Sequence, residues 1–348
     1  MPGTRGTILA LVALFASLVC GSVWASDFAA AEQLLQKGEL AQAEALYSRV
    51  AADDPNYPLA LLRLGTIFYV TGRPAPAEQK FKAYLKLHPS AEAYCLLAGA
   101  QFNLQEFAEA YESAKQSIAL DPAYAKAYTA LGMIYTANGN WPEAKAAYQE
   151  ALRLNPQDAD TWYMMGRSEF LRDEFAAAKE AFQASLRLDP GQVRAYENLS
   201  FTLDLLNEPA QAEETYKNGI RASERRKSAD PHIYIAYGKF LAKRGRAAES
   251  LEEMRAAVRV APRDPEAHYE LANQLFSTKH LEEARKEGEA AMLLGGPEYR
   301  VAYLLARTCT ALGDSPAASK YAQEAARLAE THPASNGTRD SASSLPRQ

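Results

Sequence analysis

The sequence predicts an all-α fold in which about nine helical hairpins stack into a solenoid. The first observation behind this prediction is a series of prolines at nearly constant spacing. Pro55, Pro89, Pro122, Pro156 and Pro190 lie 34, 33, 34 and 34 positions apart, and fixed periods in this range are typical of repeat proteins. One helical hairpin cannot bury its own apolar face, so neighbouring repeats must stack to form a core.

The second observation is the pattern within residues 125–156, AKAYTALGMIYTANGNWPEAKAAYQEALRLNP. A first apolar stripe has the spacing of one helix face and comprises Tyr128, Leu131, Gly132 and Tyr135. A second stripe follows the turn residues 138–140 and comprises Ala144, Tyr148 and Ala151. Each repeat therefore consists of a helix A and a helix B. Gly132 and Ala144 are small, so the two helices can approach closely.

Aligning the chain on the small residue of helix A and the alanine of helix B gives nine repeats between residues 26 and 329. In repeats two to nine the small residue of helix A is Gly65, Ala98, Gly132, Gly166, Ser200, Gly238, Ala272 and Ala306. Repeat one keeps Ala43, Tyr47 and Pro55. Repeat three is one residue short, and we expect the missing residue to have been lost around its helix A or turn.

The repeat phase slips once, between repeats six and seven. Helix A of repeat six begins at Val193 and helix A of repeat seven at Pro231, a spacing of 38 instead of 34 positions. The additional residues fall near 221–230, in the sequence RASERRKSA. We interpret them as one additional, exposed turn of helix B. A flexible joint or a basic docking site is the alternative.

Residues 1–25 have the pattern of a secretory signal peptide. Arg5 is their only charged side chain, and an apolar run from Ile8 to Val19 precedes small and polar residues. Small residues at Val23 and Ala25 predict cleavage after Ala25. An uncleaved membrane anchor is the alternative, because the uncharged stretch from Ile8 to Ala25 is near the minimum of roughly 17 residues for a membrane-spanning helix. The residues before Cys20 match a lipoprotein signal poorly.

Composition narrows the possible partners and cross-links. The chain has 38 Lys and Arg against 43 Asp and Glu, a formal net charge of -5, and no basic block, so its charge does not favour binding of nucleic acid.

After cleavage the cysteines are Cys95 and Cys309, far apart in sequence, and we expect two buried thiols instead of a disulfide. Residues 330–348 are rich in Ser, Pro, Asn and Thr and are expected to form a disordered tail.

No arrangement of residues in the sequence predicts catalysis. The histidines never occur in pairs at metal-ligand spacing, and they are His88, His232, His268, His280 and His332. No glycine-rich phosphate loop follows a strand, and residues 294–297, LGGP, form a turn. Acidic pairs such as Glu282–Glu283 are solvated helix faces. We therefore expect no enzyme activity, no cofactor and no metal.

The pattern aromatic-x-x-Leu-Gly-x-x-Tyr, followed by Ala-x-x-x-Tyr and then Pro, resembles the tetratricopeptide repeat (TPR). Repeats two, four and five meet this pattern almost in full, and the match extends over residues 26–329. The resemblance implies a right-handed superhelical solenoid whose concave groove is lined by positions 2, 5, 9, 12 and 13 of each helix A. It also implies a non-catalytic role in protein–protein interaction.

These positions, together with Asn198 from the adjacent position 6, give the residues expected to line the groove. They are Tyr69, Met133, Tyr163, Arg167, Phe170, Arg194, Asn198, Phe201, Lys239, Asn273, Phe276 and Arg307. Aromatic anchors beside amide and guanidinium donors suit an extended segment or a helix of another protein. The cations are expected to meet acidic residues of that partner.

Two qualifications apply to this groove. Aromatic residues such as Tyr163, Phe170 and Phe276 have the alternative of packing between adjacent repeats. Thr129 and Met133 stand where the chaperone-binding clamp of some family members has Lys and Asn, so binding of a free C-terminal carboxylate is not predicted.

The sequence thus predicts an exported, non-catalytic scaffold that assists assembly of an envelope or secretion complex in a bacterial cell envelope, in the periplasm or outside the cell. A membrane-anchored structural subunit is one alternative, favoured if residues 1–25 are retained. A ligand-binding or enzyme-associated module is another, favoured if a deep pocket forms along the groove. The expected partner is a protein, not a nucleic acid, and a membrane is contacted only through an uncleaved N-terminal segment.

Overall fold

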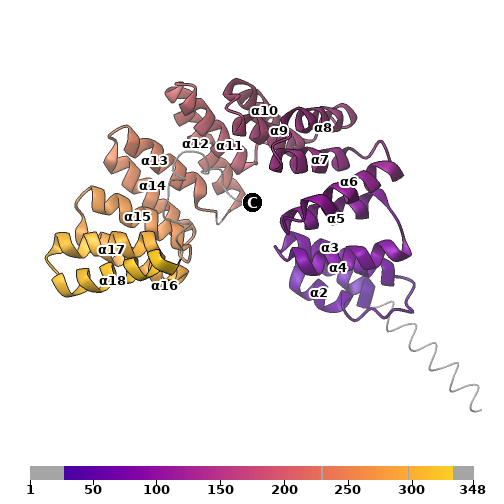
Figure 1. The fold of residues 1–348 in the computed structure, drawn as a ribbon, viewed down its shortest axis with the longest axis horizontal. Helices are drawn as coiled ribbons and strands as arrows, with labels where there is room; N and C mark the ends of the chain where they lie inside the picture. Colours follow the sequence, from indigo (N-terminus) through magenta and orange to yellow (C-terminus); the bar gives the residue numbers. More distant parts are fainter. Residues whose placement is uncertain (1–26, 229, 297, 332–348) are drawn as a thin grey trace, which may run out of the picture. The chain divides into compact units, whose positions relative to one another are not determined.

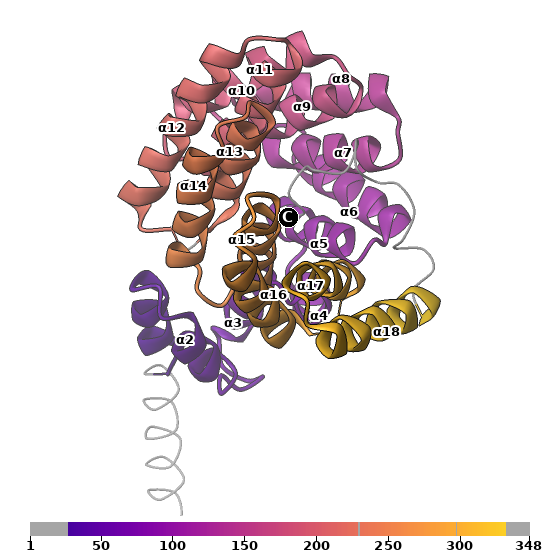
Figure 2. The ribbon, with the colours of Figure 1, turned by 90° about the vertical axis from the view of Figure 1, so that its left-hand side faces the viewer.

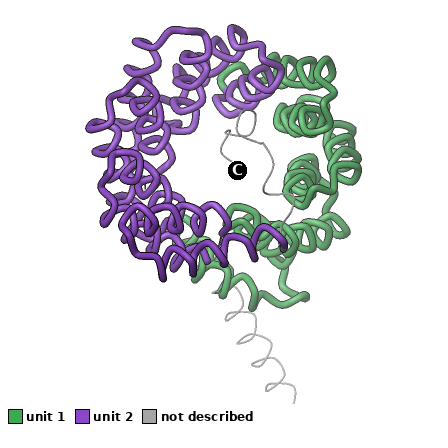
Figure 3. Tube along the Cα trace, turned by 60° about the vertical axis from the view of Figure 1, so that its left-hand side comes forward, with its two compact units in different colours: residues 1–157 green, residues 158–348 purple. Residues whose placement is uncertain are grey.

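A computed structural model of the 348-residue chain describes residues 27–228, 230–296 and 298–331. Within these residues the regular secondary structure is helical and contains no strand, and no helix has both the length and the apolar character needed to cross a membrane. The chain divides into two compact units, residues 1–157 and 158–348 (Figure 3). The predicted signal peptide and residues 332–348 of the predicted tail lie outside the described residues.

Unit 1 is a stack of helical hairpins, and over its described residues there are four (Figure 1). The first pairs a helix over residues 27–36 with α2 (Leu40–Tyr47). The next three are α3 (Tyr57–Val70) with α4 (Pro74–Leu87), α5 (Ala91–Asn103) with α6 (Phe107–Leu120), and α7 (Ala125–Ala137) with α8 (Trp141–Leu154). In each hairpin a helix A precedes a helix B, as the repeat pattern predicts.

Unit 2 contains five further hairpins within its described part, and Figure 2 shows several of them side by side. They are α9 (Ala159–Leu171) with α10 (Phe175–Leu188), α11 (Val193–Leu205) with α12 (Pro209–Arg226), α13 (His232–Lys243) with α14 (Ala247–Val260), α15 (Pro265–Ser277) with α16 (Leu281–Gly295), and α17 (Tyr299–Leu312) with α18 (Ser315–Thr331). The predicted all-α stack of about nine repeats is therefore confirmed.

A residue with a left-handed backbone joins helix A to helix B in every described hairpin. In chain order these residues are Gly38, Gly72, Gln105, Gly139, Asp173, Asn207, Gly245, Lys279 and Gly313. Glycine adopts a positive φ without a Cβ clash, and Asn and Asp tolerate it better than most residues. The turn predicted at residues 138–140 thus recurs along the chain, and its wider interval from Asn207 to Gly245 reproduces the phase slip.

The residue missing from repeat three belongs to the loop directly before its helix A, which narrows the predicted position around helix A or the turn. α5 and α7 both have 13 residues, and the turns 104–106 and 138–140 are equal in length. The loop before α5 spans residues 88–90, whereas the loop before α7 spans residues 121–124. The Ser90 hydroxyl accepts a hydrogen bond from the Ala93 N–H (3.2 Å), so α5 is capped directly after the shortened loop.

The close approach of helices A and B depends on a glycine that faces a large ring. A Cβ atom added at Gly132 would lie 2.5 Å from Cε1 of Tyr148, whose side chain is 1% exposed. Gly65 faces Phe81 in the same way. A buried ring cannot retreat without opening the core, so the small residue predicted on helix A is a steric requirement.

Both cysteines of the described chain are free thiols, as predicted, although their burial differs. Cys309 is buried, whereas Cys95 is half-buried. Burial raises the pKa of the Cys95 thiol to about 12. Cys95 is therefore protonated at neutral pH and acts as a small packing residue.

α12 absorbs the phase slip between repeats six and seven. It has 18 residues, whereas α10 has 14, and it ends where Lys227 adopts a left-handed conformation. The predicted helix extension is observed, but the segment 221–226 is not fully exposed, because Ala222 and Ser223 are buried. Arg226 forms an ion pair with Asp189 (2.9 Å), so this cation of the extension pairs within the chain.

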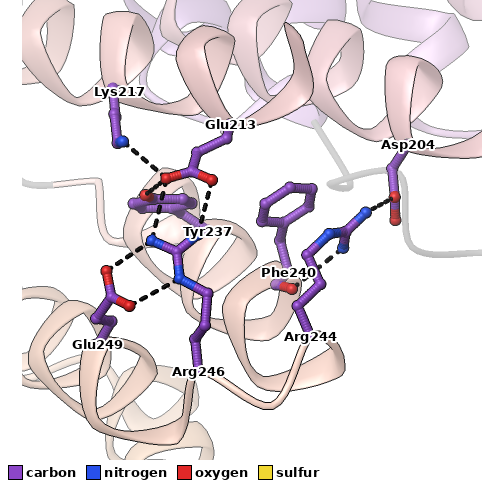
Figure 4. Close-up of polar contacts among 8 residues, drawn as sticks. All are labelled: Asp204, Glu213, Lys217, Tyr237, Phe240, Arg244, Arg246 and Glu249. Atoms are coloured by element: carbon purple, nitrogen blue, oxygen red, sulfur yellow. Dashed lines mark hydrogen bonds and ion pairs between the residues drawn. The ribbon is translucent and has the colours of Figure 1, made fainter. Parts of the chain in front are cut away.

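Two separate groups of polar contacts link the hairpins on either side of the extension (Figure 4). One group comprises Glu213, Lys217, Tyr237, Arg246 and Glu249, and the other comprises Asp204, Arg244 and the backbone oxygen of Phe240. Glu213 of α12 accepts hydrogen bonds from Arg246, at the start of α14 (2.7 Å), and from Tyr237 of α13 (3.1 Å). Asp204 of α11 pairs with Arg244, which follows α13. Hydrogen bonds from Arg246 and Lys217 lower the pKa of the Glu213 carboxyl to about 2.

We expect Gly132→Ala to lower the free energy of unfolding of unit 1 by about 1–3 kcal/mol, because the new methyl group overlaps the buried Tyr148 ring. Urea unfolding followed by the fluorescence of Trp141, on α8 of the same hairpin, measures this loss once Trp24 and Trp162 are replaced by Phe. In a Tyr148→Ala background the substitution should cost much less. An equal cost in both backgrounds would contradict the proposed steric contact.

We expect Glu213→Gln to lower the thermal unfolding midpoint at neutral pH by an amount that shrinks in acid. The folded-state pKa of about 2 lies below the ordinary value of 4.5, so ionised Glu213 stabilises the fold above about pH 4.5 and this contribution is lost as the pH falls toward about 2. Thermal scans of both proteins across that range measure the difference. Glu214→Gln, at an exposed neighbour, is the control. A difference that stays constant with pH would contradict this account.

Candidate partner-binding surface

The A helices of unit 2 carry all the predicted site residues except Tyr69 and Met133. Consecutive A helices contact one another along the series α9, α11, α13, α15 and α17. We call the side of these five helices that faces away from the B helices the helix A surface of unit 2. Because the contacts are continuous, residues from neighbouring repeats meet on this surface.

The two predicted residues of unit 1 lie on separate hairpins. Tyr69, in the last turn of α3, packs against α5, since a Cβ atom added at Gly99 would lie 2.8 Å from the Tyr69 hydroxyl oxygen. Burial raises the pKa of the Tyr69 hydroxyl. Tyr69 therefore packs between adjacent hairpins. Met133 is half-buried on α7.

Six predicted residues come together where α9 packs on α11, and we call them the α9–α11 cluster. They are Tyr163, Arg167, Phe170, Arg194, Asn198 and Phe201. The Asn198 amide donates a hydrogen bond to the Tyr163 hydroxyl (3.1 Å). The ring centroids of Phe170 and Phe201 are 5.7 Å apart. The Arg167 guanidinium lies 5.9 Å from the centroid of the Tyr163 ring.

Two members of the α9–α11 cluster are buried and contribute to packing. Tyr163 is 6% exposed and Asn198 is 3% exposed. Burial raises the pKa of the Tyr163 hydroxyl, and the nearby Arg167 and Arg194 oppose this rise. Tyr163 and Asn198 thus support the cluster from below, whereas Phe170 and Phe201 are half-buried and Arg194 is exposed.

The two arginines of the α9–α11 cluster form no ion pair with the described residues. The Nε atom of Arg167 is buried and has no hydrogen-bond partner there, which leaves a costly donor unsatisfied. Glu197 of α11 interacts electrostatically with Arg194, but burial raises the pKa of its carboxyl to about 7. Its negative charge therefore compensates Arg194 only in part at neutral pH.

Lys239 of α13, also predicted as a site residue, is paired within the chain. Its ammonium nitrogen lies 2.6 Å from Oε1 of Glu270 on α15, and Glu270 is 7% exposed. Burial raises the pKa of the Glu270 carboxyl, while Lys239 opposes this effect. Because the pair is partly desolvated, Lys239 is less available to an acidic partner than the sequence implies.

The remaining predicted residues meet where α15 packs on α17, and together with Tyr303 we call them the α15–α17 cluster. Its members are Asn273, Phe276, Tyr303 and Arg307. The Arg307 guanidinium lies 4.7 Å from the Phe276 ring centroid and 5.6 Å from the Tyr303 ring centroid. Asn273 and Arg307 are exposed, and Phe276 is half-buried.

Sequence reasoning missed the carboxylates on the helix A surface. Glu270 pairs with Lys239, and Glu266 accepts a hydrogen bond from Arg300 (3.1 Å). Glu197, Glu266 and Glu270 occupy positions 5, 2 and 6 of their helices, positions that the helical spacing already directs to this surface. Opposite charges at these positions in neighbouring repeats are the sequence signal that indicates such ion pairs.

The chain matches a family model described as tetratricopeptide repeat. The matches cover residues 28–92, 95–159, 129–193 and 238–292, which together make up more than half of the chain. No curated protein sequence matches the chain significantly.

Two solved structures have a similar fold. The yeast Tom70 structure is 16% identical in sequence and has a TM-score of 0.65. The match covers 82% of this chain and 62% of the Tom70 chain. A chain of the APC/C hetero-tetramer Cut9–Hcn1 is 15% identical in sequence and has a TM-score of 0.54. The match covers 77% of this chain and 52% of that chain. This chain thus spans less than two thirds of either protein, and at such identities the likeness concerns the fold alone.

Proposed function

Because the chain belongs to the tetratricopeptide repeat family, whose members generally act as scaffolds for protein interaction, we propose that it is a non-catalytic scaffold that binds a segment of a partner protein. The binding site in this proposal is the helix A surface of unit 2. The segment is extended or helical and carries acidic residues.

The observation that carries this proposal is a set of arginines on that surface that form no ion pair within the described residues. Arg167, Arg194 and Arg307 form no ion pair within the described residues, although Arg300 and Lys239 on the same surface do. An arginine that is not neutralised by its own chain favours acidic groups of a partner.

The aromatic residues beside these arginines supply apolar contacts. Phe170 and Phe201 adjoin each other near Arg167, and Phe276 adjoins Arg307. Each of these rings is half-buried, so part of its surface remains for a ligand. Aromatic and arginine side chains are the residue types that contribute most to protein interfaces. Both clusters therefore combine an apolar anchor with a cation.

We expect neutralisation of the α9–α11 cluster by Arg167→Gln with Arg194→Gln to reduce partner capture about tenfold or more, because two charge-assisted contacts are lost. Immobilised protein incubated with an envelope fraction from the native organism, with mass-spectrometric quantification of the main captured protein, measures the effect.

The matched control for this variant is Arg187→Gln with Arg259→Gln. Both residues are exposed and lie on B helices, α10 and α14, so the net charge changes equally away from the proposed surface. The control should capture the partner as the wild type does, and circular dichroism should be the same for all three proteins. Equal capture by the helix A variant and the wild type would refute the proposed surface.

We further propose that the protein is exported and assists assembly of an envelope or secretion complex in a bacterial envelope. The signal-like pattern of residues 1–25 supports this location. N-terminal sequencing of the protein recovered from cells should give a mature start at Ser26. Recovery of chains that retain residues 1–25 would instead support a membrane-anchored subunit.

A further inference from the structure

Arg307 lies close to two aromatic rings of the α15–α17 cluster. Its guanidinium lies 4.7 Å from the Phe276 centroid and 5.6 Å from the Tyr303 centroid. Tyr303 also stacks on Tyr299, one turn earlier on α17, at 5.9 Å and 13°. These contacts engage the faces of the guanidinium and restrict its rotamers, while its N–H groups form no hydrogen bond within the described residues.

Arg307 differs from the other Lys and Arg residues of α13, α15 and α17 because those residues form ion pairs within the chain. Lys239 pairs with Glu270, and Lys243 pairs with Asp204. Arg300 lies 4.5 Å from the Tyr269 ring centroid, a stacking similar to that of Arg307, but Glu266 neutralises it. Among the Lys and Arg residues of these three helices, Arg307 has no carboxylate partner within the described part of the chain.

We infer that Arg307 binds the carboxylate of a glutamate or aspartate in an extended segment of the partner protein, while an apolar residue beside that acid packs on the exposed part of Tyr303. Tyr303 is 49% exposed, which is high for so large an aromatic residue. The exposed Asn273 on α15 supplies an amide for the backbone of the segment. This inference rests on the proposed function and assigns the α15–α17 cluster its own ligand chemistry.

Charge complementarity and preorganisation favour this occupant. A guanidinium presents two parallel N–H groups to a carboxylate, and its stacking on Phe276 and Tyr303 fixes their direction before the ligand arrives. Less side-chain entropy is then lost on binding. The chain's own residues 332–348 are the competing occupant. They contain Asp340, but also Arg339 and Arg347, so their charge complements the site less well.

Fluorescence anisotropy with two labelled peptides tests this inference on the full chain. In the first peptide glutamate alternates with leucine, and in the second glutamine replaces every glutamate. We expect the wild type to bind the glutamate peptide about tenfold more tightly than the glutamine peptide, and Arg307→Gln to abolish this preference. Arg259→Gln, on the exposed surface of α14, is the matched control and should retain the preference. Circular dichroism confirms that each variant is folded.

Several outcomes would overturn the inference. It is wrong if the wild type shows no preference for glutamate, or if Arg307→Gln retains the wild-type preference. If that preference is instead lost in Arg167→Gln with Arg194→Gln, the proposed function stands and only the role of Arg307 is refuted. If a chain ending at Thr331 binds the glutamate peptide and the full chain does not, the tail occupies the site and the partner assignment is wrong. Partner capture tests the proposed function independently.

Discussion

The fold depends on the contact between a small residue of helix A and a large side chain of helix B. Where Gly132 faces Tyr148, even one methyl group would overlap a buried ring. This spacing brings the two helices of a hairpin together, but one face of the hairpin remains apolar until the next repeat covers it. The same constraint explains why Gly65 and Phe81 occupy the equivalent positions two repeats earlier. Stability therefore arises between neighbours along each unit.

The fold was predictable because its determinants are local and repeated. The proline spacing and the stripe around Gly132 identify helices A and B, and the length of the chain between Val193 and Pro231 predicts the extension of α12. The shortened loop at Ser90 was predicted only as a loss around helix A or the turn, because a missing residue alters the period equally wherever it falls within a repeat. The burial of Ala222 was not predictable, since it depends on packing against other helices and not on the pattern of α12 itself.

The candidate site was predictable only as a set of helix positions. The positions of Arg167 and Arg307 on helix A follow from the repeat, and the structure brings each next to aromatic rings. The burial of Tyr163 with Asn198 and the pairing of Lys239 with Glu270 depend on contacts between repeats. A repeat alignment cannot supply such contacts. These contacts distinguish the residues that support the surface from those that remain available to bind a partner.

The distribution of charge connects the packing of the hairpins to binding. Between hairpins, acids and bases are matched, as in the contacts of Glu213 with Arg246 and of Arg285 with Asp314. On the helix A surface of unit 2 several arginines form no ion pair within the described residues, beside half-exposed rings.

The most direct test of partner binding on this surface is site-specific photo-crosslinking with benzoylphenylalanine at Phe201, on α11, and at Gln183, on α10. We expect a partner cross-link from position 201 and none from position 183. A cross-link from position 183 alone would contradict it.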